Sequence, residues 1–136
     1  MPHIVKSFDQ DLDEIKNVIN EMAGNVETQL TYALQSIDER DSELARRIVD
    51  RDVKIDSLYE RILDLSIRLF ALRQPMANDL RFVISTNKIA ADIERIGDQT
   101  KNIAKASRWL AEIPTSKNVL STSNLAKLVQ VVKIVN

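Results

Sequence analysis

Cysteine is absent from this sequence of 136 residues, and histidine occurs only once, as His3 near the N-terminus. Without cysteine the chain cannot form a disulfide, bind zinc through a thiolate or use a thiol as a nucleophile. A single histidine near the terminus also argues against histidine-ligated metal sites and most acid–base or triad chemistry in the interior. The composition therefore gives little support to an enzyme built on either residue type.

Glycine and proline are also scarce, with two glycines and three prolines in the chain. All-β folds need many turn residues, so this scarcity predicts long, uninterrupted helices. The net charge is −1, and basic residues are interspersed with acidic ones, so the chain offers no basic field for a nucleic acid. No apolar run approaches the ~20 residues that span a bilayer, and the N-terminus lacks the apolar core of a signal peptide. We therefore expect a cytosolic protein.

Apolar residues recur every three or four positions in three stretches, at about 8–37, 41–72 and 75–111. Asp41 is a good N-cap for the second stretch, and Pro75 marks the turn before the third. Three long helices joined by short connections predict an all-α fold, an antiparallel three-helix bundle.

The apolar stripes also predict which residues face the core. In the first stretch the heptad pattern includes Leu30, and in the second the apolar position expected at 51 is occupied by arginine. The third stretch is apolar on more than one face, which predicts packing against two neighbours.

The C-terminal part of the chain differs from the rest. We expect the bundle to occupy residues 1–112, followed by a linker at 113–120 and the start of a fourth helix at 121–136. The run at 129–135 is rich in β-branched residues, so a strand remains an alternative there.

Glu94 and Asp98 lie four residues apart and therefore share one face of the third helix. Glu94 has no cation three or four residues away in either direction, and Asp98 has only Arg95 and Lys101 at these distances. A single acidic pair of this kind is ordinarily a solvated surface, but an incompletely balanced pair also invites an external cation.

Asp52 and Asp56 repeat this spacing on the second helix. Antiparallel helices place residues at equal distance from their connecting turn side by side, and the two pairs are centred equally far from position 75. If both pairs face the same side, Asp52, Asp56, Glu94 and Asp98 converge within ~10 Å, the usual spacing of packed helices. Such oxygen ligands favour Mg²⁺, Mn²⁺, Ca²⁺ or iron.

Several alternatives remain open at this stage. Gly97 either allows close approach at the metal or only relieves crowding between helices. The basic residues Lys101, Lys105 and Arg108 either contact an acidic partner or are ordinary surface charges. Trp109 either caps the bundle end or contacts a partner. The bundle as a whole could also be a purely structural interaction module without metal. A di-iron enzyme would need Glu-x-x-His motifs, which this chain lacks.

Two motifs resemble the PhoU family of bacterial phosphate-uptake and phosphate-signalling regulators. They are Arg73-Gln74-Pro75-x-Ala77-x-Asp79-Leu80-Arg81 at the second turn and Ile93-Glu94-Arg95-Ile96-Gly97-Asp98 in the third helix. The likeness extends over about residues 3–110. It implies a fold of two similar three-helix bundles, of which this chain holds one.

The resemblance also implies a site and a role. Glu94 and Asp98 match the family's Glu/Asp-x-x-x-Asp metal motif, with Asp52 and Asp56 as the companion pair. The resemblance implies either a polynuclear iron or zinc centre, or bound magnesium and manganese. The family implies a regulator without catalysis, acting at the inner face of the membrane with the ATPase subunit of the phosphate ABC transporter and the phosphate-sensing histidine kinase. The expected outcome is repression of the phosphate-starvation response when phosphate is plentiful. We also expect a homo-oligomer, in which two chains pair as a dimer.

Overall fold

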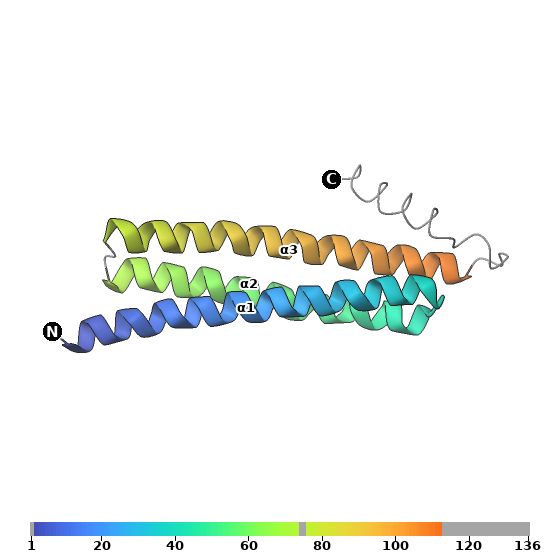
Figure 1. Ribbon diagram of the computed structural model, residues 1–136, viewed down its shortest axis with the longest axis horizontal. Coiled ribbons are helices and arrows are strands. Elements are labelled where there is room, and N and C mark those ends of the chain that lie inside the picture. The colour runs from blue at the N-terminus through green and yellow to red at the C-terminus, as the bar shows by residue number, and fades with distance from the viewer. Residues whose placement is uncertain (1, 74–75, 113–136) are drawn as a thin grey trace. The chain divides into compact units, whose positions relative to one another are not determined.

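The computed structural model describes residues 2–73 and 76–112, with side chains for residues 8–72 and 76–112. Three α-helices fill these ranges, α1 (Pro2–Asp38), α2 (Ser42–Arg73) and α3 (Ala77–Glu112), and no strand occurs within them (Figure 1). The predicted all-α bundle of three antiparallel helices is confirmed. The predicted linker at 113–120 and the fourth helix at 121–136 lie outside the described residues, as does Pro75.

The helices contribute to two compact units, and each unit contains a segment of all three helices. Unit 1 comprises residues 1–26 and 53–95, and unit 2 comprises residues 27–52 and 96–136. Each unit has its own buried apolar core. The core of unit 1 contains Ile15, Val18, Met22, Val26, Ile55, Leu58, Ile62, Leu65, Leu69, Val83 and Ala90. The core of unit 2 is smaller and contains Ala33, Ile37, Ala45, Ile48, Ile103 and Ala104.

The connection between α1 and α2 is short because both helix ends are capped. Arg40 has a φ of 53°, and the bonds from Arg40 N to Ile37 O (3.2 Å) and from Asp41 N to Ser36 O (2.9 Å) form a Schellman motif. The Asp41 carboxylate then accepts a hydrogen bond from Leu44 N at 3.0 Å, which confirms the predicted N-cap. The two caps reverse the chain within unit 2.

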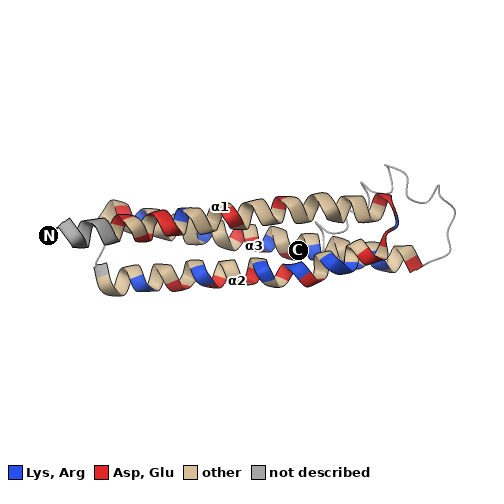
Figure 2. Ribbon diagram, turned by 90° about the horizontal axis from the view of Figure 1, so that it is seen from below, with Lys and Arg blue, Asp and Glu red and all other residues tan. Residues whose placement is uncertain are grey.

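Polar contacts link the helices of unit 1. Asn87 Nδ2 on α3 donates to Ser66 Oγ on α2 at 2.7 Å, which aligns these antiparallel helices. Arg61 on α2 forms an ion pair with Glu14 on α1. Along α2, basic and acidic residues are interspersed (Figure 2), as the sequence predicts.

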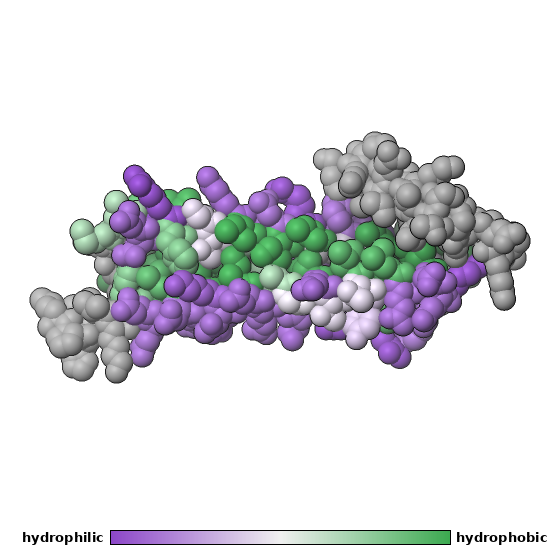
Figure 3. All heavy atoms as spheres, in the orientation of Figure 1, coloured by the Kyte–Doolittle hydropathy of each residue, from purple (hydrophilic) through white to green (hydrophobic). Residues whose placement is uncertain are grey.

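Much of the inward face of α3 is formed by small residues, and several of its large apolar side chains are exposed, contrary to the expectation. Val83, Ala90, Gly97 and Ala104 are buried at intervals of seven residues. Three isoleucines that the sequence placed in the packed arc are about half exposed, namely Ile84 (44%), Ile89 (53%) and Ile96 (50%). Apolar side chains accordingly reach the surface on the face drawn in Figure 3. Ile84, Ile89 and Ile96 therefore lie on the exposed side of α3, whereas Ile103 is buried in the core of unit 2. No described helix is long and apolar enough to cross a membrane.

Candidate metal centre

Asp52 is a carboxylate at a core position of α2, with only 1% of the residue exposed. Ala45, Ile48 and Ile55 are also buried, so the heptad pattern of this segment passes through position 52. The expectation that position 51 lies on the core stripe was wrong, because Arg51 is exposed. The break in the apolar pattern is therefore a buried acid and not a surface arginine.

Two side chains of unit 2 contact the Asp52 carboxylate. Gln29 Nε2 on α1 donates to Asp52 Oδ1 at 3.4 Å, and Lys101 Nζ on α3 lies 3.7 Å from Asp52 Oδ2. The Oδ2 atom is buried and has no hydrogen-bond partner. Burying a carboxylate is costly unless it is paired and hydrogen-bonded, and these two long contacts compensate for it only in part.

Gln29 is a site residue that the sequence pattern missed. It is 3% exposed, whereas Leu30, which we expected in the core, is 36% exposed. Gln29 follows Ile15 and Met22 at intervals of seven, and this spacing could have identified it as an inward polar residue. Its Nε2 also donates to the backbone oxygen of Gly97 at 3.4 Å. Gly97 therefore faces α1, which favours a packing role for this glycine.

Asp98 brings a further carboxylate to Asp52 within unit 2. Asp98, exposed on α3, has a carboxylate oxygen within 4.8 Å of one of Asp52. Asp56, one turn along α2 and half-buried, belongs to unit 1, and its part in a metal site stays a prediction. Oxygen ligands lie about 2.0–2.6 Å from Mg²⁺ or Ca²⁺, so two ligands on opposite sides of an ion are about 4–5 Å apart. The spacing of these carboxylates fits a divalent cation.

The predicted alignment of the second and third helices is confirmed by the pair Asp52 and Asp98. These residues lie 23 positions before and 23 positions after position 75. Among the described residues, the carboxylates that meet the 4.8 Å distance do not include Glu94, which is half-buried one turn before Asp98. Its part in a metal site remains a prediction.

The cations near Asp98 in the sequence have other ion-pair partners. Arg95 pairs with Asp92 at 3.3 Å, and Lys101 pairs with Asp52. Among the described side chains, neither cation forms an ion pair with Asp98. Within unit 2, Lys101 thus brings one positive charge to the two carboxylates of Asp52 and Asp98, and a divalent cation would supply more. The all-oxygen donor set suits hard cations such as Mg²⁺ and Mn²⁺ and also accepts iron.

Trp109 does not belong to the buried core of unit 2, since it is 64% exposed. Together with Val49, Lys105, Arg108 and Glu112 it lines a shallow depression of about 330 Å³. The end-capping role that we considered for Trp109 is therefore not what the structure has, and a partner contact remains open.

Comparison with known proteins relates this arrangement to one family. Residues 19–107 match the family model described as the PhoU domain. A phosphate-specific transport system accessory protein PhoU homolog of Caulobacter vibrioides is 39% identical over 129 residues, covering 94% of this chain and 56% of the relative. The homolog of Xylella fastidiosa is 42% identical over 126 residues, covering 93% of this chain and 52% of the relative.

A solved structure supports the same relationship. The crystal structure of PhoU from Pseudomonas aeruginosa matches with a TM-score of 0.75 and 32% sequence identity, covering 83% of this chain and 56% of that chain. The chain therefore spans about half the length of the relatives that it matches.

Proposed function

The chain belongs to the PhoU family, and from this premise we propose that it regulates phosphate uptake and the phosphate-starvation response. Its relatives are named accessory proteins of the phosphate-specific transport system. In the proposed role the protein catalyses no reaction. It connects the ATPase subunit of the phosphate ABC transporter with the phosphate-sensing histidine kinase, at the cytoplasmic face of the membrane. The family match and the resemblance of the two motifs support this role.

The proposed regulator binds metal through Asp52, Asp56, Glu94 and Asp98. The observation that carries this part is the buried Asp52 Oδ2, which accepts no hydrogen bond while an Asp98 oxygen lies within 4.8 Å of the Asp52 carboxylate. Magnesium or manganese, or a polynuclear iron or zinc centre, would supply the positive charge that this arrangement lacks. Bound metal would hold α2 and α3 together.

The metal content of the purified protein tests this proposal. After dialysis against Mn²⁺ or Fe²⁺ and removal of free metal, elemental analysis should find at least one ion per chain. A double variant carrying Asp52→Asn and Asp98→Asn should lose it. The control, Asp50→Asn with Asp92→Asn, changes two exposed acids on the same helices and should retain the metal. Equal, substoichiometric metal in the wild type and in the Asp52/Asp98 variant would refute the site.

The adaptor role needs a separate test. The immobilised chain should retain the purified transporter ATPase subunit and the cytoplasmic part of the kinase. In cells, the chain should lower expression of a phosphate-starvation reporter when phosphate is plentiful. Failure to retain either partner would exclude the adaptor role while leaving the metal result unaffected.

The second candidate is a structural interaction module without metal. It is favoured by the 3.7 Å contact of Lys101 Nζ with Asp52 Oδ2, because a cation of the chain itself then lies beside the buried carboxylate. This candidate predicts that the melting temperature is the same in chelator and in divalent cations.

A further inference from the structure

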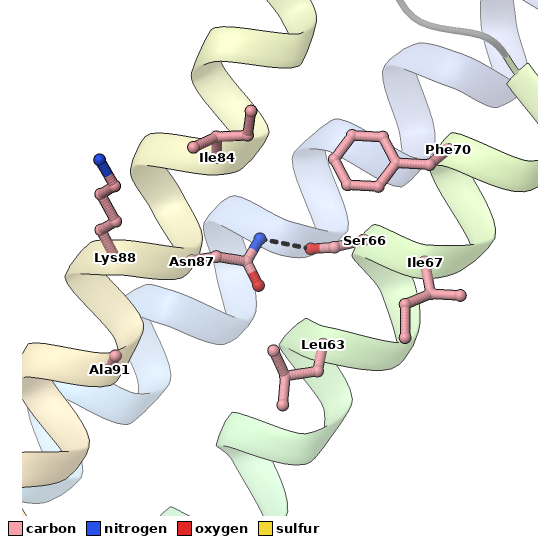
Figure 4. Close-up of a pocket in the computed structure, with 8 residues that line it drawn as sticks. All are labelled: Leu63, Ser66, Ile67, Phe70, Ile84, Asn87, Lys88 and Ala91. Carbon is pink, nitrogen blue, oxygen red and sulfur yellow. Dashed lines mark hydrogen bonds between the residues drawn. The ribbon is translucent and has the colours of Figure 1, made fainter.

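Asn87 and Gln29 are carboxamide side chains that make contacts between helices, and they do so in different ways. In unit 1, Asn87 lines an apolar groove of about 380 Å³ between α2 and α3 (Figure 4). Its Nδ2 atom donates to Ser66 Oγ at 2.7 Å and to the oxygen of Val83 at 2.8 Å, so it forms short bonds with neutral acceptors. In unit 2, both bonds of Gln29 are 3.4 Å long, and one of them goes to the carboxylate of Asp52. Alignment of two helices accounts for Asn87, whereas Gln29 also acts on a buried acid.

The orientation of the Gln29 amide follows from its two neighbours. Asp52 Oδ1 on α2 and the backbone oxygen of Gly97 on α3 are both acceptors, and an amide oxygen placed beside them would be repelled. The nitrogen must therefore face them, and its two hydrogens supply one donor for each acceptor. Gln29 is buried, so water has little access to these bonds. One side chain of α1 thus contacts Asp52 and the residue that precedes Asp98.

The two oxygens of the Asp52 carboxylate are consequently not equivalent. Oδ1 accepts the bond from Gln29, whereas the buried Oδ2 has no hydrogen-bond partner. Lys101 Nζ lies 3.7 Å from Oδ2, which is longer than a hydrogen bond. Asp98, also in unit 2, has a carboxylate oxygen within 4.8 Å of one of Asp52. Oδ2 is therefore the Asp52 oxygen that is left for a cation.

We propose that Gln29 determines which cation the site prefers, an inference that rests on the proposed metal-binding function. By holding Oδ1, Gln29 limits Asp52 to one ligand oxygen, Oδ2. Ca²⁺ accepts more oxygens than Mg²⁺ and often takes both oxygens of one carboxylate, whereas Mg²⁺ and Mn²⁺ suit an octahedral set of ligands. An Asp52 that offers a single oxygen therefore favours Mg²⁺ and Mn²⁺ over Ca²⁺. Gln29 is a positioning residue, since it acts through Asp52.

Gln29→Met tests this role, because methionine is unbranched and of similar length but has no N–H donor. Titration calorimetry of the whole chain should show that the wild type binds Mn²⁺ more tightly than Ca²⁺. In Gln29→Met the dissociation constant for Mn²⁺ should rise about tenfold, and that for Ca²⁺ should change by less than about threefold. The matched control is Gln35→Met. Gln35 is an exposed glutamine of α1 that donates to Glu39, and its loss should leave both constants unchanged.

A second variant and a second measurement support the first. Gln29→Glu keeps the length of the side chain but removes both donors, so it should also lower the preference for Mn²⁺ over Ca²⁺. Infrared difference spectra between the Mn²⁺-loaded and metal-free chain report whether bound carboxylates use one oxygen or two. The separation of the asymmetric and symmetric carboxylate bands should be wide in the wild type and narrower in Gln29→Met, because Oδ1 is then free to join the metal.

The outcomes separate this role from the metal site itself. Equal weakening of Mn²⁺ and Ca²⁺ binding in Gln29→Met, or constants and spectra that match those of the wild type, would make Gln29 a packing residue and overturn the proposal. A wild type that prefers Ca²⁺ would overturn it as well. A wild type that binds neither ion would refute the proposed metal-binding function, and the role of Gln29 with it. Circular dichroism confirms that each variant remains helical.

Discussion

Asp52 occupies a position where a helical bundle normally places an apolar side chain. Its carboxylate is buried, yet its contacts with Gln29 and Lys101 are 3.4 and 3.7 Å long. A buried carboxylate with weak compensation reduces stability, and it also makes binding of an additional cation favourable. The stability of the metal-free protein and its metal affinity should therefore depend on the same few side chains.

Substitution of Lys101 should separate these two effects. Lys101→Gln removes the ion-pair partner of Asp52. Without metal, this change should lower the free energy of unfolding by roughly 1–2 kcal/mol. The loss is smaller than for a fully buried pair because Lys101 is partly exposed. The same change removes a competing positive charge and should raise the affinity for Mn²⁺ about tenfold. Urea unfolding in chelator measures the first effect, and titration calorimetry measures the second.

The control for this residue is Lys105→Gln, which changes an exposed lysine one turn further along α3 that forms no ion pair among the described residues. It should alter neither quantity appreciably. A weaker affinity for Mn²⁺ in Lys101→Gln would show that the lysine supports the site instead of competing with the metal.

At the scale of the helices, the boundaries were largely predictable because they depend on local chemistry. The Asp41 N-cap fixes the start of α2, and the structure confirms the bond that the sequence predicts. The start of α1 was not predicted: the apolar stripe begins at about residue 8, whereas the helix begins at Pro2. Proline is well suited to the first turn of a helix, so the chain can be helical before the apolar pattern starts.

The N-cap gives a prediction at this scale. Asp41→Ala should reduce the free energy of unfolding by about 1 kcal/mol, because the Leu44 backbone N–H loses its acceptor. Asp41→Ser restores a side-chain oxygen at the same place and should recover most of the loss. Both variants can be compared by urea unfolding at constant protein concentration. If serine were as harmful as alanine, the charge of Asp41 and not its hydrogen bond would be the stabilising feature.

The rotation of each helix was harder to predict than its boundaries. Counting apolar residues placed Leu30 in the core and assigned the break in the second stripe to position 51, but Gln29 and Asp52 are the buried residues. Each assignment was off by one residue, about 100° around a helix. Apolar counting fails where the core itself is polar, and those polar core positions are the ones that form the candidate centre.

At the scale of the whole molecule, the order of the helices and their alignment followed from a few features of the sequence. Short connections imply antiparallel neighbours, and the constant rise per residue then places Asp52 level with Asp98, as observed. Which side chains turn toward each other depends on packing that the sequence does not specify locally. The open groove between α2 and α3 is a consequence of this packing, since small residues of α3 face inward and Ile84 is left outside.

The global stability of the protein should increase when metal binds, because the proposed ligands belong to two helices and are separated in the unfolded chain. At a free Mn²⁺ concentration of 100 times the dissociation constant, linkage predicts a gain of about 2.7 kcal/mol. For a chain of this size the melting temperature should then rise by roughly 10 °C.

Melting curves should be recorded with Mn²⁺ and with chelator at equal ionic strength, so that screening of surface charges is the same in both. Asp98→Asn should remove most of the rise, and Asp92→Asn, an exposed acid on the same helix, should retain it. Identical melting of the wild type under both conditions would exclude a metal that stabilises the fold and would favour the metal-free structural module.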